Sequence, residues 1–324
     1  MKQKEIAELV GVSVATVSLA LRDSDKVNKK TKEKIKRIAE LLNYKPNEIA
    51  RSLVCKKTNI IGIIIPTFSI TYYTEFAYAL QNNLRKKGFF SLIMSGNKEN
   101  IKEIIEMFLR WRVEGIITNK IGFEILRAVK IGIPVVLYEK VEEGDYVSVN
   151  KFKGGYKATE HLIKIGYRKI GFLCSPYFEE ERTRGYIEAL SDYGISIDKK
   201  IIFPGLGYFE EGYKGAKELL KRGIEGIFCL NDVSAIGAIR ALKEENVRIP
   251  EDIGIVGFDN IEESKYIYPS LTTVNQPKEK IAEKIVEILL KKLNERTERS
   301  QILIDPELII RESCGYKKRK GVKI

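Results

Sequence analysis

The 324-residue chain is long enough for two domains, and its 44% hydrophobic content is enough to form a sizeable buried core. The apolar runs are too short to span a membrane, and the charged amino terminus lacks the apolar core of a signal peptide, so we expect a cytoplasmic protein without a membrane partner. Four widely separated cysteines and a single histidine argue against disulfides and a metal site, and we expect no cofactor.

The net charge of +12 is concentrated at the two ends of the chain. Residues 1–57 contain 14 Lys and Arg against 7 Asp and Glu, and residues 317–324 contain five basic residues and no acidic one. The segment between them is formally neutral. A basic head on a neutral body indicates that the head binds a polyanion such as DNA, whereas the short basic tail reads as a solvated end.

The stretch from Gly11 to Arg22 alternates valines with polar residues, as a half-buried strand does. We nevertheless predict a helix, because no other strand-like segment lies nearby to pair with it. Ser13 has the side chain of a helix N-cap, and the residues before Gly11 are apolar at helical spacing.

A third amphipathic helix is predicted after Asn28, a plausible N-cap, with its apolar residues at i, i+3, i+4 and i+7. Ala7, Gly11 and Val17 have the spacing of a helix-turn-helix. The small Ala7 allows two helices to cross closely, Gly11 makes the turn, and Val17 packs in the core between the helices. We therefore predict a three-helix DNA-binding domain over residues 1–44.

From Asn59 onward, short β-branched runs alternate with amphipathic helices. This alternation is typical of βαβ units, and about ten predicted strands in two sets indicate two doubly wound parallel sheets. The fold class is therefore α/β, with a small helical head and a two-lobed body.

Several motifs together resemble the lactose/galactose repressor (LacI/GalR) family: "IAELVGVSVATVS", "LNYKPNEIARSL", "EHLIKIGYRKIGFL", "NDVSAIGAIRAL", "RIPEDIGIVGFDN" and "PSLTTVNQP". The resemblance covers nearly the whole chain in order. It implies a hinge helix over residues 45–57, in which Leu53 acts as a minor-groove wedge. The DNA-contacting positions that it implies are Ser13, Val14, Ala15, Thr16, Ser18, Arg22, Asn28, Thr31, Tyr44, Asn47, Ala50 and Leu53.

The resemblance also implies that the body, residues 58–316, has the two lobes of a periplasmic sugar-binding protein. The first lobe is expected near 58–149 and 277–303, and the second near 150–275 and 304–316. The chain is expected to cross between them near 149–151, 274–276 and 303–305. In such a fold the ligand lies between the lobes, at the carboxyl ends of the strands.

Polar and aromatic residues at those strand ends are the candidate effector-binding residues. Asp259 suits sugar hydroxyls as an acceptor, although it could instead cap a helix, and Arg182 suits hydroxyls or a carboxylate, although it could instead form a surface ion pair. Where the family has an Asp-Asn pair, this chain has Asn150 and Lys151, so this corner of the site is expected to differ. The full set of candidates is Tyr72, Tyr73, Glu139, Arg182, Tyr208, Asn231, Phe258, Asp259 and Gln276.

We therefore expect a sequence-specific transcriptional repressor rather than an enzyme, binding palindromic operator DNA as a homodimer under the control of a sugar effector. Motifs of serine hydrolases, P-loop proteins and zinc proteases are absent from the sequence, and the lone His161 offers little for acid–base catalysis. One alternative is a regulator that responds to a purine corepressor or a phosphoprotein. Another is a sugar-processing enzyme with a DNA-binding head.

Overall fold

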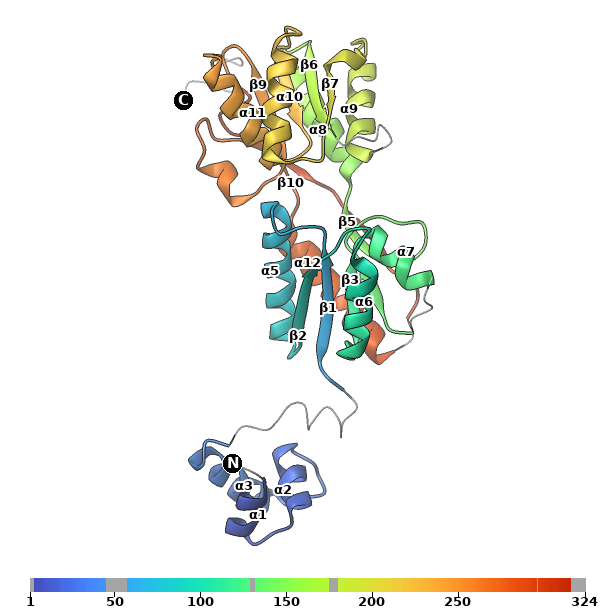
Figure 1. Ribbon diagram of the computed structural model, residues 1–324, viewed down its shortest axis with the longest axis vertical. Coiled ribbons are helices and arrows are strands. Elements are labelled where there is room, and N and C mark those ends of the chain that lie inside the picture. Colours follow the sequence, from blue (N-terminus) through green and yellow to red (C-terminus); the bar gives the residue numbers. More distant parts are fainter. Residues whose placement is uncertain (1–2, 45–56, 129–131, 175–179, 296, 316–324) are drawn as a thin grey trace. The chain divides into compact units, whose positions relative to one another are not determined.

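A computed structural model describes residues 3–44, 57–128, 132–174, 180–295 and 297–315. The chain divides into two compact units, Met1–Thr58 and Asn59–Ile324. Figure 1 shows a small helical unit and a larger unit built from two sheets. The predicted hinge residues Asn47, Ala50 and Leu53, and the basic tail 317–324, lie outside the described residues.

The first unit is built from three helices, α1 (Gln3–Val10), α2 (Val14–Leu21) and α3 (Lys29–Leu41). Gly11 makes the turn between α1 and α2 at a φ of 77°, in the left-handed region that glycine tolerates best. The Ser13 hydroxyl accepts a hydrogen bond from the Thr16 amide at 3.1 Å, and Asn28 caps α3 in the same way. The predicted helix from Ser13 onward is confirmed. A small apolar core holds the three helices together: Ile6, Ala7, Val10, Val17, Ala20, Val27, Ile35 and Ala39.

The second unit contains two six-stranded sheets, each at the centre of one lobe. The sheet of the first lobe has the order β11-β5-β4-β3-β1-β2. Its strands are β1 (Ile60–Ile65), β2 (Phe90–Ser95), β3 (Gly115–Thr118), β4 (Val135–Leu137), β5 (Asp145–Val149) and β11 (Gln301–Ile304). The sheet of the second lobe has the order β12-β10-β9-β8-β6-β7. Its strands are β6 (Ile170–Cys174), β7 (Ile202–Pro204), β8 (Gly226–Cys229), β9 (Gly254–Asp259), β10 (Thr272–Asn275) and β12 (Glu307–Ile309).

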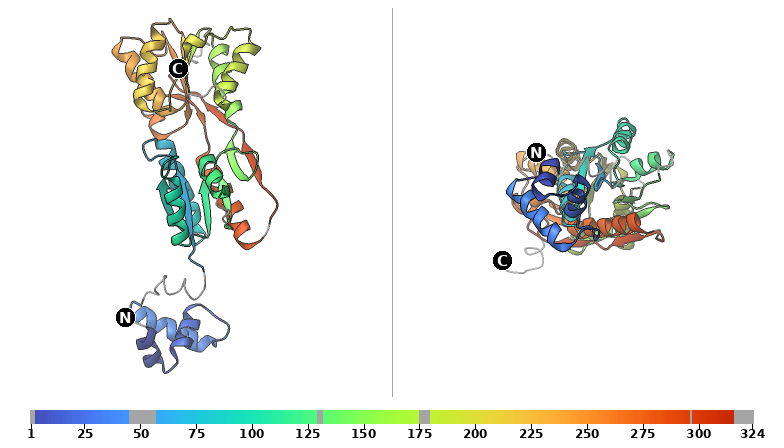
Figure 2. Two further views of the ribbon diagram at one scale, coloured as in Figure 1. Left: turned by 45° about the vertical axis from the view of Figure 1, so that its right-hand side comes forward. Right: turned by 90° about the horizontal axis from the view of Figure 1, so that it is seen from below.

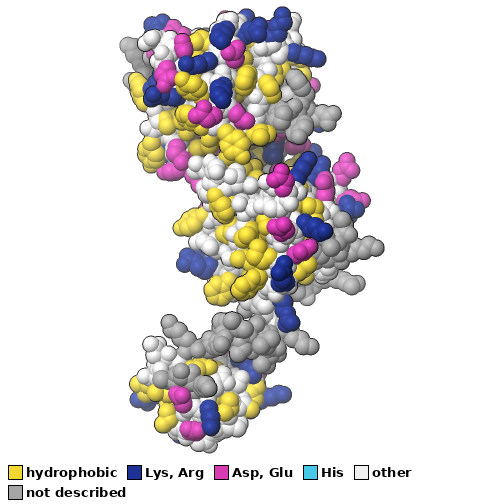
Figure 3. Space-filling model, in the orientation of Figure 1, with side chains coloured by type: hydrophobic (Ala, Val, Ile, Leu, Met, Phe, Trp, Pro, Cys, Tyr) yellow, Lys and Arg dark blue, Asp and Glu magenta, His cyan; other side chains and the backbone are white. Residues whose placement is uncertain are grey.

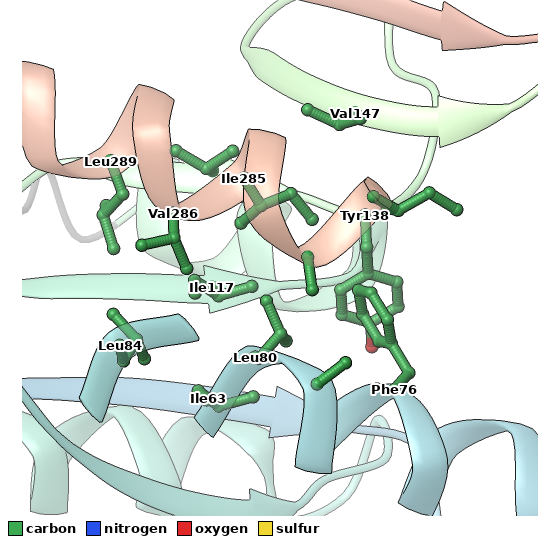
Figure 4. Packing of buried hydrophobic residues seen from close by; sticks show 14 of the residues in the cluster. Ile63, Phe76, Leu80, Leu84, Ile117, Tyr138, Val147, Ile285, Val286 and Leu289 are labelled. Atoms are coloured by element: carbon green, nitrogen blue, oxygen red, sulfur yellow. The ribbon is translucent and has the colours of Figure 1, made fainter. Parts of the chain in front are cut away.

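Helices cover both faces of each sheet, as βαβ connections require. In the first lobe, α5 (Thr71–Lys86) and α12 (Lys278–Asn294) pack their apolar residues on one face, which Figure 4 shows from close by. The opposite face is covered by α6 (Ile101–Arg110) and α7 (Lys120–Ala128). In the second lobe, one face is covered by α8 (Lys151–Lys164) and α9 (Glu181–Asp192), and the other by α10 (Phe209–Leu220) and α11 (Asp232–Glu244). Two short 3-10 helices, Lys199–Ile201 and Glu262–Lys265, complete this lobe.

The chain passes between the lobes three times, from β5 to α8, from β10 to α12 and from β11 to β12 (Figure 2). These passages explain why one pair of strands in the body departs from the predicted parallel arrangement. β10 ends where the chain leaves the second lobe and β12 begins where it returns, so the two neighbours run antiparallel. β5 and β11 both end where the chain leaves the first lobe, and they are parallel.

The surface of the two lobes is consistent with the formally neutral charge of residues 58–316. On the face shown in Figure 3, basic and acidic side chains are interspersed over both lobes. Among the described residues, no helix combines the length and the apolar character needed to cross a membrane.

Candidate functional site

A polar cavity of about 80 Å³ lies where the carboxyl ends of strands from both sheets meet. Its walls come from the start of α5, the end of β9, the first turns of α8 and α9, and the segments after β4, β7, β8 and β10. Ligands of doubly wound proteins bind at such strand ends. The lining residues are Ile70, Tyr72, Tyr73, Tyr138, Glu139, Lys151, Arg182, Leu206, Leu230, Asn231, Asp259 and Gln276.

A larger hollow of about 510 Å³ lies elsewhere on the first lobe, beside Phe123 and Leu126. It includes Val135 and Asp145, which begin β4 and β5, so it lies at the amino ends of these strands. The smaller cavity is the better candidate for a ligand site, because charged and amide side chains of both lobes converge on it.

The guanidinium of Arg182 is held in place from three sides. Its Nε donates a hydrogen bond to Glu180 at 2.8 Å, its Nη1 donates to the carbonyl of Leu230 at 2.8 Å, and its Cζ lies 5.1 Å from the centre of the Phe258 ring. Burial acts to lower the pKa of Arg182, but the carboxylates of Glu180 and Asp259 outweigh it and raise the pKa. Arg182 is therefore a rigid, fully charged donor at the cavity wall.

Asp259 ends β9 with a φ of 119°, a left-handed conformation that is strained for a residue other than glycine. Its side chain is only 3% exposed and accepts a hydrogen bond from Gln276 Nε2 at 2.6 Å. Burial raises the pKa of Asp259 to about 6, although Arg182, Gln276 and Lys278 oppose the shift. The carboxylate is thus ready to accept hydrogen bonds, at the cost of burying its charge.

A buried carboxylate behind Asp259 fixes the turn that carries it. Asp232 accepts hydrogen bonds from the Thr273 hydroxyl at 2.5 Å and from the Ile261 amide at 3.0 Å. Burial, and then the charge of Asp259, raise the pKa of Asp232 well above its ordinary value. From the first turn of α12, Lys278 Nζ donates to the carbonyl of Asp259 at 3.1 Å. The strained turn is therefore held from both lobes.

Tyrosines line the first-lobe side of the cavity. The rings of Tyr72 and Tyr73 meet edge to face, with their centres 5.3 Å apart. Burial raises the pKa of both hydroxyls, so they stay neutral and can donate hydrogen bonds to a ligand. Glu139 accepts a hydrogen bond from the Lys120 amide at 3.0 Å, which orients its carboxylate. On the second-lobe side, Asn231 caps α11 through its Oδ1.

The helical unit presents a different kind of surface. Val14, at the start of α2, is 44% exposed, and Ala15 is also exposed. Arg22 bonds back to the carbonyl and the hydroxyl of Ser18 at 3.0 and 2.9 Å, which holds its guanidinium beside the helix. Thr16, Ser18, Thr31 and Tyr44 are half-buried, and Asn28 is exposed.

Comparisons with known proteins agree with this arrangement. Residues 2–47 match the model of bacterial regulatory proteins of the lacI family, and residues 159–314 match that of a periplasmic binding protein-like domain. The HTH-type transcriptional repressor PurR of Pasteurella multocida is 32% identical over 96% of this chain and 97% of its own length. The chain belongs to the LacI family. It is a DNA-binding transcriptional regulator with an effector-binding domain, not an enzyme.

Solved structures of transcriptional regulators have the same architecture. The match to the complex of the transcriptional regulator CelR with cellobiose covers 97% of this chain and 99% of the CelR chain, with a TM-score of 0.72 and 26% identity. A LacI-family regulator from Enterococcus faecium with bound ribose covers 78% of this chain and 98% of the other, with a TM-score of 0.72 and 28% identity. The lac repressor dimer bound to operator has a TM-score of 0.88 over 97% of this chain and 99% of the other, and at 24% identity it supports the fold alone.

Seven of the nine predicted effector-binding residues of this LacI-family regulator line the cavity: Tyr72, Tyr73, Glu139, Arg182, Asn231, Asp259 and Gln276. Two predicted residues do not. Phe258 is fully buried, with its ring next to the Arg182 guanidinium, and Tyr208 is 40% exposed at the start of α10. Phe258 therefore supports Arg182 from behind and offers no face to a ligand in the cavity.

Sequence reasoning left out five residues of the cavity wall: Ile70, Tyr138, Lys151, Leu206 and Leu230. The sequence did point to Lys151, since it lies at the expected crossing near 149–151. It also left out Glu180, which caps α9 and binds Arg182. The sequence "EERTRGY" places Arg182 two residues after Glu180, which could have suggested this ion pair.

Proposed function

We propose that this regulator is a cytoplasmic repressor whose affinity for a palindromic operator is set by a sugar bound in the cavity. The observation that carries the proposal is the meeting of Asp259, Arg182 and Asn231 with two tyrosines at strand ends of both lobes. Charged donors and acceptors beside aromatic rings suit a ligand with many hydroxyls. The cellobiose and ribose complexes of related regulators support this ligand class.

Because the cavity takes side chains from both lobes, a ligand in it favours one arrangement of the lobes over others. A ligand can change DNA affinity only through its different affinity for those arrangements. The cavity of about 80 Å³ is small beside the ~300–1,000 Å³ of typical ligand sites. We propose that the lobes move apart to admit the effector and close around it.

We also propose that the regulator acts as a homodimer, which fits the palindromic operator. Large aromatic side chains are exposed on both lobes: Tyr78 at 64%, Phe90 at 68%, Tyr266 at 77% and Tyr268 at 78%. Where such side chains form a contiguous patch, they mark an interaction surface. A second copy of the chain is the partner that we propose for them.

Selection from random DNA tests the DNA-binding part of the proposal. Sequences enriched by the full chain are expected to be palindromic, with half-sites about one helical turn apart. The two recognition helices of a dimer read the two half-sites. Enrichment of single, non-repeated sites would contradict the dimer, and enrichment of no sequence would contradict specific recognition.

Effector affinity is expected to depend on pH through Asp259. If the charged carboxylate accepts the ligand's hydroxyls, affinity is constant above about pH 7 and falls as the pH drops through the pKa of about 6. The decline approaches about tenfold per pH unit at lower pH. Calorimetric titrations of the wild type and of Asp259→Asn check this, because the variant should lose the decline. An equally steep decline in both proteins would assign the titration to another group.

A further inference from the structure

One corner of the cavity is formed by the first turns of α8 and α9, which lie in backbone contact. A Cβ added at Gly155 would lie 2.3 Å from the carbonyl oxygen of Arg182, and one added at Gly185 would lie 2.1 Å from that of Phe152. Only glycine allows the two helices to approach so closely. The approach brings Lys151 and Arg182, each in the first turn of its helix, to the same corner of the cavity wall.

The two cations of this corner are not equally compensated. Both carboxylate oxygens of Glu180 already accept hydrogen bonds. Oε1 accepts from Arg182 Nε at 2.8 Å, and Oε2 accepts from the Arg182 amide, at the start of α9, at 2.8 Å. Lys151, by contrast, has no hydrogen bond or ion pair with any described residue. Its charge helps to lower the pKa of Glu180, which indicates that it lies nearby without pairing.

Arg182 also keeps donors for a ligand. Within the part of the chain that the structure describes, its Nε and Nη1 have partners, whereas its Nη2 is bonded to none. The guanidinium cannot turn away, because Glu180 and Leu230 hold it and the Phe258 ring lies beside it. The corner therefore offers a fixed guanidinium N–H and an ammonium group to which no carboxylate of the described residues is bound.

The crossing from β5 into α8 brings a cation and no carboxylate of its own to this corner, since Asn150 is uncharged and Lys151 is basic. Asn150 is the N-cap of α8, and its Oδ1 accepts a hydrogen bond from the Lys153 amide at 3.0 Å. Lys151 is left to face the cavity.

We propose that the effector carries an anionic group, a carboxylate or a phosphate, that Lys151 and Arg182 bind at this corner. Charge-assisted bonds from an ammonium and a guanidinium suit either group. The inference rests on the proposed function, since the remainder of the ligand is a polyol that contacts Asp259, Asn231 and the tyrosines. The effector is therefore a sugar acid or a sugar phosphate, not a neutral sugar.

Matched neutral and charged ligands test the proposal on the full chain by calorimetry at constant ionic strength. The probes are glucose, glucuronate and glucose 6-phosphate, together with ribose, ribose 5-phosphate and inorganic phosphate. At least one charged sugar is expected to bind about tenfold or more tightly than its neutral parent. Preference for glucuronate identifies a carboxylate, and preference for a sugar phosphate identifies a phosphate.

Lys151→Met, which keeps the apolar stem, should reduce the affinity for the charged sugar toward that for its neutral parent, and Arg182 should account for any preference that is left. Lys214→Met, at an exposed position on α10, is the matched control and should leave both affinities unchanged. Binding of neutral sugars alone, unaffected by Lys151→Met, would overturn the anionic group but leave the sugar-controlled regulator intact. Binding of inorganic phosphate that depends on Lys151, with no sugar bound, would support the anion site and contradict the sugar. Binding of no probe would overturn the inference.

Discussion

A chain that lacks residues 1–58 is expected to lose specific operator binding, by about a thousandfold or more. The deletion removes the compact helical unit with the exposed start of α2. It also removes the basic residues of the helical unit, and residues 58–316 that remain are formally neutral. Effector affinity should be unchanged, because every residue that lines the cavity lies in the unit Asn59–Ile324. Fluorescence anisotropy with operator DNA and calorimetry with effector measure the two affinities.

The truncated chain keeps the five basic residues of 317–324, which can attract DNA without recognising its sequence. It therefore serves as a control for non-specific DNA binding. Any residual binding should be equal for operator and random DNA and should vanish at high salt. For the full chain, log affinity should fall with log salt by about 0.9 per phosphate contact. If the truncated chain still preferred operator over random DNA, DNA recognition would have to be assigned to the larger unit.

The elements of the fold could be predicted because each has a local cause. Ser13 and Asn28 cap their helices with bonds to amides three residues onward, a pattern that is readable in the sequence. Central strands of the body, such as β1, are largely buried β-branched runs. The antiparallel pairing of β12 with β10 was not predicted, because it depends on where the third crossing returns the chain.

The cavity was harder to predict because strand position does not fix side-chain direction at a strand end. Phe258 and Asp259 are adjacent, yet Phe258 points into the core, and the φ of 119° at Asp259 sets where the carboxylate lies. The partner of Arg182 depends on the cap of α9, where Glu180 serves both the helix amides and the guanidinium. Such shared roles appear only when the helix ends are placed in space.

Asp259→Asn is expected to weaken effector binding by about 1.5–3 kcal/mol, or roughly 10- to 150-fold, because a charged acceptor becomes a neutral one. The amide keeps an oxygen for the bond from Gln276 Nε2 and has nearly the same shape, so the cavity should stay intact. Operator binding without effector should be normal. The variant should therefore bind DNA but fail to respond to effector at wild-type concentrations, measured by anisotropy with and without ligand.

The same variant should be more stable than the wild type above pH 6, which separates lost recognition from damaged folding. The pKa of Asp259 is about 6 in the folded chain against an ordinary value of 3.8, so the folded state binds more protons between these values. Stability from this group therefore falls as pH rises from about 4 to 6, and the full penalty, about 1–3 kcal/mol, persists above pH 6. Asn carries no charge, so the variant does not have this penalty in its free energy of unfolding. Glu188→Gln, on the exposed side of α9, should change neither stability nor binding. A variant that lost both stability and effector binding would make Asp259 a residue of the fold instead of a ligand contact.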